Sequence, residues 1–153
     1  MNLVQLRDFI VDPVLRGIGA YSPAAMRLVI GTGLVESGFE WVQQVGGPAA
    51  GFWQMEPKTH DDIHRHFLAA RPRLRTAVML LAAPGIELSA QLRGNLFYAA
   101  ALCRVHYLRV PEPMPEAENI EALGRYWKAH YNTPSGKGTV EGFCRKAAAI
   151  AEL

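Results

Sequence analysis

The sequence predicts one mainly α domain over residues 1–153, with a central buried helix and an irregular or small β insertion after it. Three observations lead to this fold class. Hydrophobic residues recur at helical spacing along most of the chain. The stretch 23–35 is apolar nearly all round, as in a helix buried on every side. Residues 39–56 lose the helical period and contain Gly46, Gly47, Pro48 and Gly51.

The N-terminal third should contain two helices. Apolar residues predict a short first helix that breaks near Pro13: Leu3, Leu6, Phe9 and Ile10. The central helix should begin at Ser22-Pro23, because serine is a good N-cap and proline suits the first turn. Gly38 is the expected C-cap.

Helical spacing resumes after the insertion. It predicts helices over about 58–68, 72–82, 89–110, 119–130 and from 139 towards the end. Ser89, Asn119 and Thr139 are the expected N-caps of the last three. Proline, glycine and polar residues mark connections at 111–118 and 131–139.

Bulk composition excludes several classes of protein. Half of the residues are hydrophobic and 20% are charged, which argues against a disordered chain. The net charge of +2 comes without a Lys/Arg block, so we expect no nucleic-acid partner. No apolar run approaches the roughly 20 residues of a membrane span, so no stable membrane insertion is expected. Cys103 and Cys144 are isolated and are expected to be buried thiols, not a disulfide.

Glu36 is a single acid in the last turn of the predicted central helix. The negative end of the helix dipole disfavours a carboxylate there, and apolar neighbours such as Phe39 and Trp53 would desolvate it. Both effects raise the pKa of a carboxyl group. A carboxyl that stays protonated near neutral pH suits general-acid cleavage of a glycosidic bond. The alternative is that Glu36 simply faces solvent at a helix end.

Short motifs in this region resemble those of a known enzyme family. The segments "ESGF" (36–39) and "AAGFWQMEP" (49–57) resemble the Glu-Ser and Gly-Leu-Met-Gln signatures of soluble-type (SLT) lytic transglycosylases, in the lysozyme-like superfamily. The segment "HYNTPSGKG" (130–138) resembles that family's Ala-Tyr-Asn-Ala-Gly-Pro-Gly element. A weaker match is "NLFYA" at Asn95, which resembles the family's Asn-Ile helix start. The resemblance implies a lysozyme-like fold.

The resemblance also implies an activity. These enzymes cleave the β-1,4 bond between N-acetylmuramic acid and N-acetylglucosamine in peptidoglycan, using one glutamate that matches Glu36. That acid protonates the glycosidic oxygen and then takes a proton from the C6 hydroxyl of the muramic acid, which closes a 1,6-anhydro ring. No second acid is needed, unlike the two-carboxylate glycosidases. No cofactor and no metal are implied.

The same matching assigns substrate-binding roles around Glu36. Gln54 would hold sugar through its amide, and Tyr131 would orient the acid or the sugar. Asn132 and Ser37 would each contact the substrate or fix a loop. The rings of Phe52, Trp53 and Trp41 would stack on sugar faces or pack in the core.

The sequence departs from the family pattern in ways that bear on the reaction. Phe52-Trp53 replace Leu-Met, His130 replaces an alanine, Thr133-Pro134 replace Ala-Gly, and Ala99 replaces a glycine. Glu56 adds an acid near Gln54 and could activate water, which would make the protein a hydrolytic muramidase. A third reading is a non-catalytic wall-binding or virion-structural module.

Two further expectations concern metals and location. His60 and His64 are four residues apart in "HDDIHRH", as helical metal ligands are, but the acids and Arg65 beside them favour a solvated surface.

No signal peptide is recognised at the N-terminus. We therefore expect synthesis in the cytoplasm and action at the wall. The routes are a bacteriophage virion or holin, a secretion machine, or a longer parent chain. Expected partners are peptidoglycan glycan strands and other virion or secretion-machine proteins.

Overall fold

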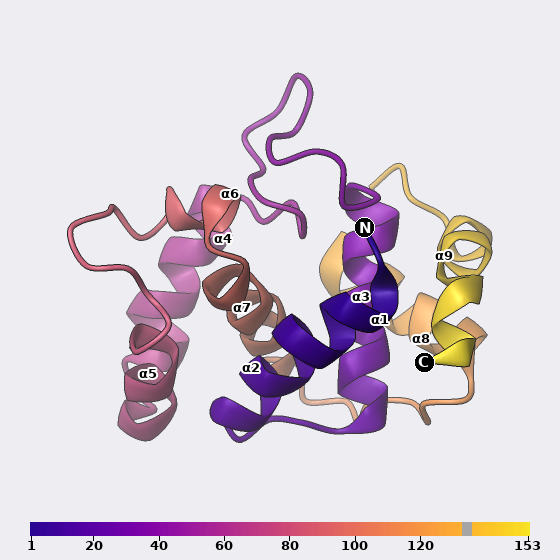
Figure 1. Ribbon diagram of the computed structural model, residues 1–153, viewed down its shortest axis with the longest axis horizontal. Helices are drawn as coiled ribbons and strands as arrows, with labels where there is room; N and C mark the ends of the chain where they lie inside the picture. The colour runs from indigo at the N-terminus through magenta and orange to yellow at the C-terminus, as the bar shows by residue number, and fades with distance from the viewer. Residues whose placement is uncertain (133–135) are drawn as a thin grey trace.

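A computed structural model describes residues 1–132 and 136–153, and its central element is α3 (Pro23–Glu36) (Figure 1). The helix begins as predicted, because the Ser22 hydroxyl accepts a hydrogen bond from the Ala25 amide at 3.0 Å. It ends where Gly38 takes a left-handed backbone with φ 65° and donates to the Gly33 carbonyl. Nearly every residue between Ala25 and Gly33 is buried, so the predicted central buried helix is confirmed.

The N-terminal segment corrects one prediction. It is α1 (Leu3–Leu6), a π-helical segment η1 (Arg7–Val11) and α2 (Asp12–Gly17), which follow without a break through Pro13. The amide of Asp12 bonds to the Arg7 carbonyl five residues back. This wider turn accommodates a proline ring that would clash with a normal α-helical turn, and so the chain stays helical.

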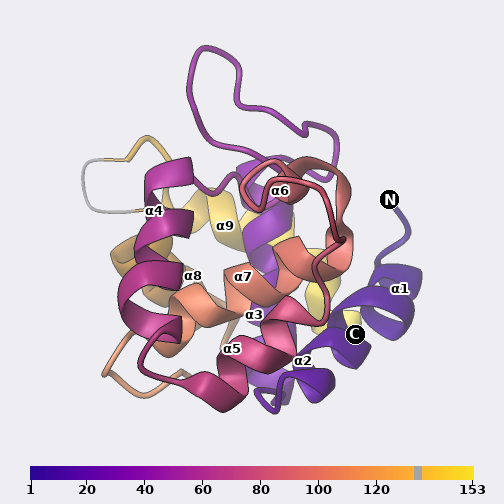
Figure 2. The same cartoon turned by 90° about the vertical axis from the view of Figure 1, so that its left-hand side faces the viewer.

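In chain order the remaining helices are α4 (Pro57–Asp62), η2 (Ile63–Leu68), α5 (Pro72–Met79), α6 (Gln91–Gly94), α7 (Leu96–Leu108), α8 (Ile120–Trp127), η3 (Lys128–Asn132), α9 (Val140–Ala147) and η4 (Ala148–Glu152). Some of them lie directly on α3, and others, such as α4 and α5, lie beyond α7 (Figures 1 and 2). α3 packs against α7, α8 and α9. The two chain ends lie on the same side, where Arg7 donates to the carbonyl of Leu153 at 2.8 Å.

Two of the three predicted later N-caps are confirmed. Asn119 accepts from the Ala122 amide at 2.9 Å, and Thr139 accepts from the Gly142 amide at 3.0 Å. Ser89 does not cap a helix through Val110. The helical run is divided into α6 and α7 at Asn95, whose extended backbone and side chain start α7 by accepting from an amide one turn on.

Of the two forms expected for the insertion, irregular or small β, the β form is wrong. Residues 39–56 contain only two isolated bridges, Gln43 with Ala50 and Ala50 with Met55, and the described residues form no sheet. Helices hold 61% of the described residues, so the mainly α part of the prediction is confirmed while the α+β architecture expected of a lysozyme-like domain is not. A ladder cannot extend here because Gly51 and Gln54 both have positive φ, which interrupts extended strands.

The insertion is instead an irregular loop that projects beyond the helices at the end where α3 finishes (Figures 1 and 2). Its return is fixed at Gly51, whose φ is 76°. A Cβ at that position would collide with the backbone carbonyl of Leu92, so only glycine fits. The loop therefore has one defined path back to the helices.

Cys103 is fully buried and Cys144 is partly buried, and both are free thiols as expected. Among the described residues, no helix combines the length and the apolar character needed to cross a bilayer.

Candidate functional site

Glu36 ends α3 and is partly buried beneath an aromatic cover. Its Oε1 accepts a hydrogen bond from the indole Nε1 of Trp127 at 3.0 Å. Phe39 folds back over the same helix end. Its ring occupies the space that a Cβ on Gly33 would fill, so the close packing depends on glycine at that position. The carboxyl group is thus held at the end of α3 by the indole of Trp127, and the Phe39 ring packs on the same helix end at Gly33.

Burial raises the pKa of Glu36 from its usual 4.5 to about 7. Removing a carboxylate from water disfavours its charged form, and here this outweighs three opposing effects. Hydrogen bonds from Trp127 and Asn132 and the positive charge of Lys146 each lower the pKa. The result is a carboxyl group that exchanges its proton near neutral pH, as the sequence led us to expect.

An open pocket of about 440 Å³ lies beside this carboxyl group. Its lining combines Glu36, Ser37 and Lys146 with the residues that begin the loop, Glu40 and Trp41. Trp41 is 57% exposed, so a large aromatic face stands free at the pocket wall. Such a face, next to a protonated acid, suits a ligand with both hydroxyl groups and apolar ring faces.

Three of the predicted site residues hold the loop in place: Ser37 joins it to the end of α3, Tyr131 joins it to η3, and Gln54 links two parts of the loop itself. The Ser37 hydroxyl donates to the carbonyl of Phe52 at 2.7 Å, and the Tyr131 hydroxyl donates to the next carbonyl, that of Trp53, at 2.7 Å. The Gln54 amide donates to the carbonyls of Gly51 at 2.7 Å and Trp41 at 3.2 Å. These contacts fix the backbone that carries Trp41 and position the loop beside Glu36.

The two aromatic residues Phe52 and Trp53 differ in their burial. Trp53 is 1% exposed and its indole donates to the Val29 carbonyl at 2.8 Å, so it packs in the core and offers no ring face to a sugar. Phe52 is partly buried and meets the ring of Phe39 edge-on, with 5.7 Å between centroids. Trp41 is consequently the aromatic residue of the predicted set with a free face.

Of the last two predicted residues, one lies at the acid and the other does not. The Asn132 side chain faces Glu36 and also accepts from Lys128 Nζ at 2.8 Å, so the structure brings it to the acid. Glu56 precedes α4 and pairs with Lys58 at 2.8 Å; it does not line the Glu36 pocket. Thr133 and Pro134, two of the departures from the family pattern, lie outside the described residues.

Sequence reasoning missed three residues of the site. Trp127 is 91 positions from Glu36, and Lys146 is on α9. Glu40 is only four residues after Glu36, but nothing in the loop sequence predicts which side chains point back to the end of α3. The helix pairing that brings Trp127 and Lys146 to this site has no local signal.

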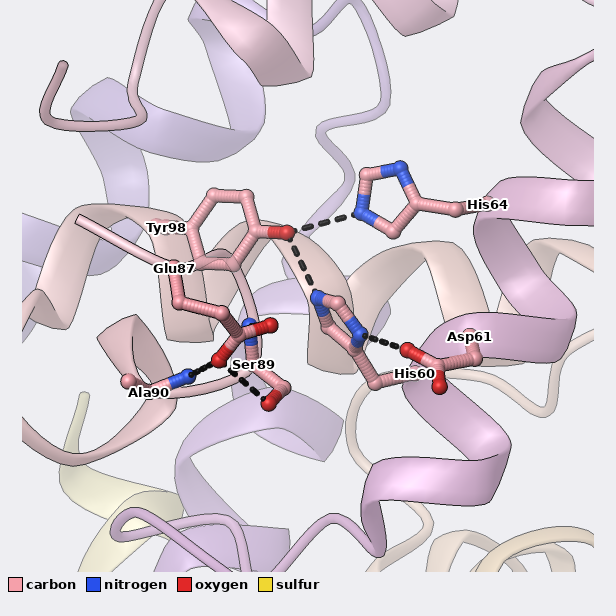
Figure 3. Close-up of polar contacts among 7 residues, drawn as sticks. All are labelled: His60, Asp61, His64, Glu87, Ser89, Ala90 and Tyr98. Atoms are coloured by element: carbon pink, nitrogen blue, oxygen red, sulfur yellow. Dashed lines mark hydrogen bonds and ion pairs between the residues drawn. The ribbon is translucent and has the colours of Figure 1, made fainter. Parts of the chain in front are cut away.

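The histidine-rich segment forms a separate cluster (Figure 3). The Nε2 atoms of His60 and His64 both lie 2.7 Å from the hydroxyl of Tyr98, and His60 Nδ1 lies 2.9 Å from an Asp61 oxygen. Burial lowers the pKa of His64 to about 4, so the ring is neutral at neutral pH. Tyr98 is fully buried, which makes this cluster an internal support between α4, η2 and α7. Within the described residues, no group of three or more His, Cys, Asp or Glu is arranged to hold a metal.

Comparison with known proteins gives no relative: no family model, no curated protein and no solved structure matches this chain.

Proposed function

We propose that this protein is a peptidoglycan lytic transglycosylase with Glu36 as its one catalytic acid and base. The observation that carries the proposal is the Glu36 carboxyl group, with its pKa raised to about 7, at an open pocket beside an exposed tryptophan. A general acid works best when its pKa lies near the operating pH. The motifs around Glu36, Gln54 and Tyr131 support the choice of peptidoglycan as substrate.

The proposed reaction has two proton transfers through the same carboxyl group. Protonated Glu36 donates to the glycosidic oxygen as the bond from that oxygen to C1 of the muramic acid breaks. The resulting carboxylate takes the proton of the C6 hydroxyl while O6 bonds to C1, which gives the 1,6-anhydro ring. A pKa near 7 favours this cycle because neither protonation state of Glu36 is costly to reach.

A hydrolytic reaction is the second candidate, and one observation favours it. Glu40 lines the same pocket as Glu36, so a second carboxyl group is available to activate a water molecule. Glu40 replaces Glu56 in this alternative, since Glu56 is paired with Lys58. The loop that carries Glu40 also carries Trp41, so both residues would meet the same sugar.

Digestion of purified peptidoglycan followed by mass spectrometry tests both candidates. Products that end in 1,6-anhydro-muramic acid support the transglycosylase, and products one water heavier identify a hydrolase. Glu36→Gln should lower turnover by roughly 10²–10⁴-fold, the usual contribution of a general acid. Glu40→Gln should leave turnover unchanged if the ring closes and should abolish it if water is the acceptor.

Two further variants complete the design. Glu56→Gln changes an acid outside the pocket and is the matched control for the other two substitutions. Trp41→Ala removes the exposed ring and should raise KM with little change in kcat, because stacking contributes to binding and not to proton transfer. Full activity of Glu36→Gln would refute the proposal, as would wall binding without any cleaved product.

A further inference from the structure

A second and larger pocket lies at the other end of α3. It has a volume of about 690 Å³ and lies between the link from α2 to α3, α5 and α7. α3 has 14 residues and so is about 21 Å long at 1.5 Å per residue. The pocket is therefore separate from the Glu36 site, and nothing in the proposed reaction uses it.

Arg104 of α7 lines this pocket and is 8% exposed. Its Nε donates to the carbonyl of Ala20 at 2.9 Å, which is its one side-chain hydrogen bond among the described residues. No carboxylate pairs with it there, and residues 133–135 contain no acid. Burial lowers the pKa of Arg104, as expected for a cation without a counter-charge.

A buried guanidinium without an acid is costly, because desolvation of a charge must be offset by a partner. The terminal nitrogens of arginine are preorganised to bind a carboxylate or phosphate through two parallel hydrogen bonds. Arg73, an exposed cation on α5, lines the same pocket, and the positive end of the α3 dipole points to it at Ser22. Three sources of positive potential thus converge on one cavity.

We propose that this pocket binds a small molecule that carries a carboxylate or phosphate group on an apolar body, with Arg104 as the anion's partner. The anion fits between the buried Arg104 and the exposed Arg73. The apolar body fits against Ile18, Leu74 and Leu108, which line the remaining wall. A volume of about 690 Å³ lies in the range of small-molecule sites.

Backbone amide NMR of the whole protein tests the site with three probes: inorganic phosphate, hexanoate and the neutral hexanol. Hexanoate or phosphate should shift the amides of Ala20, Leu74 and Leu108 in a saturable way, and hexanol should not. Hexanoate binding more tightly than phosphate identifies the apolar carboxylate as the ligand type. The reverse identifies a phosphate.

Variants assign the binding to the arginines. Arg104→Lys keeps the charge but loses the paired hydrogen bonds, so the dissociation constant should rise by about tenfold, equivalent to one such contact. Arg73→Met should weaken binding severalfold and leave the fold intact, because this side chain is exposed. Arg75→Met, on the same helix but outside the pocket, is the control.

Three results would overturn the proposal. They are equal binding in Arg73→Met and the unchanged protein, equal shifts with hexanol and hexanoate, and no shift with either anion. The second result would identify an apolar cavity that does not select for charge. Because Arg73 is exposed, the test stands even if substitution of Arg104 unfolds the protein.

Discussion

Glu36→Gln should stabilise the folded protein, and the gain should grow with pH. Glutamine has nearly the shape of a protonated glutamic acid and can still accept the 3.0 Å hydrogen bond from Trp127. The substitution therefore removes the ionisation of the group and leaves its contacts in place. Any pH-dependent difference in stability between the two proteins then reports on the carboxyl group alone.

The magnitude follows from the pKa of Glu36. A shift from 4.5 to about 7 corresponds to about 3 kcal/mol at about 1.36 kcal/mol per pKa unit. Below pH 4.5 the group is protonated in both the folded and the unfolded chain, so the shift has no effect there. As pH rises through 7, the folded protein must also ionise it, and the full penalty is present above that pH. Partial solvation from the open pocket makes about 3 kcal/mol an upper value.

Urea unfolding of both proteins between pH 4.5 and pH 8 measures this effect. The difference in unfolding free energy, variant minus unchanged protein, should increase by up to about 3 kcal/mol across that range. Other titrating groups are common to both proteins and cancel. Glu40→Gln, at an exposed acid that lines the same pocket, is the control substitution. A difference that stays constant with pH would refute the claim that Glu36 is desolvated.

Three further predictions concern the site and its surroundings. Trp127→Phe removes a hydrogen bond to the charged form of Glu36, so the pKa of Glu36 should rise above 7 by about one to two units. Carbon-13 NMR of the Glu36 carboxyl group measures this pKa, and an unchanged value would contradict the contact. Ser37→Ala leaves the Phe52 carbonyl without its donor and should cost about 1–3 kcal/mol in unfolding free energy, with faster hydrogen exchange in the loop. His64 binds its proton less readily when folded, so stability should fall as pH drops from 6.5 towards 4, and His64→Gln should lose less over that range.

Local features of the fold could be predicted from the sequence because they depend on neighbours in the chain. Ser22, Asn119 and Thr139 each accept a hydrogen bond from an amide three residues later, and the choice of these residue types is explained by that geometry alone. The same reasoning placed a break in the helix at Pro13. There it failed, because a π-helical turn provides the space that a regular turn lacks.

Local reasoning could not predict whether the insertion forms a β element or an irregular loop. Glycine and proline in residues 39–56 are compatible with either a hairpin or an irregular loop. The outcome depends on contacts with distant parts of the chain, such as the carbonyl of Leu92 against Gly51 and the hydroxyl of Tyr131 on Trp53. These contacts hold the backbone in conformations that interrupt strand pairing, and a local pattern contains no information about them.

Prediction of the candidate site from the sequence has the same limit, because the roles of its residues depend on contacts with distant parts of the chain. Glu36 could be found from sequence because a lone acid at the end of an apolar helix is a conspicuous local feature. The roles of Ser37 and Tyr131 could not, since a polar side chain near a loop is needed equally for binding a sugar and for fixing the loop. Their hydroxyl groups donate to the consecutive carbonyls of Phe52 and Trp53. A motif that is defined by spacing can therefore be explained by the geometry of the loop alone. In the proposed function, contact with substrate would fall to Trp41 and Glu40, which line the Glu36 pocket and are not part of the motif.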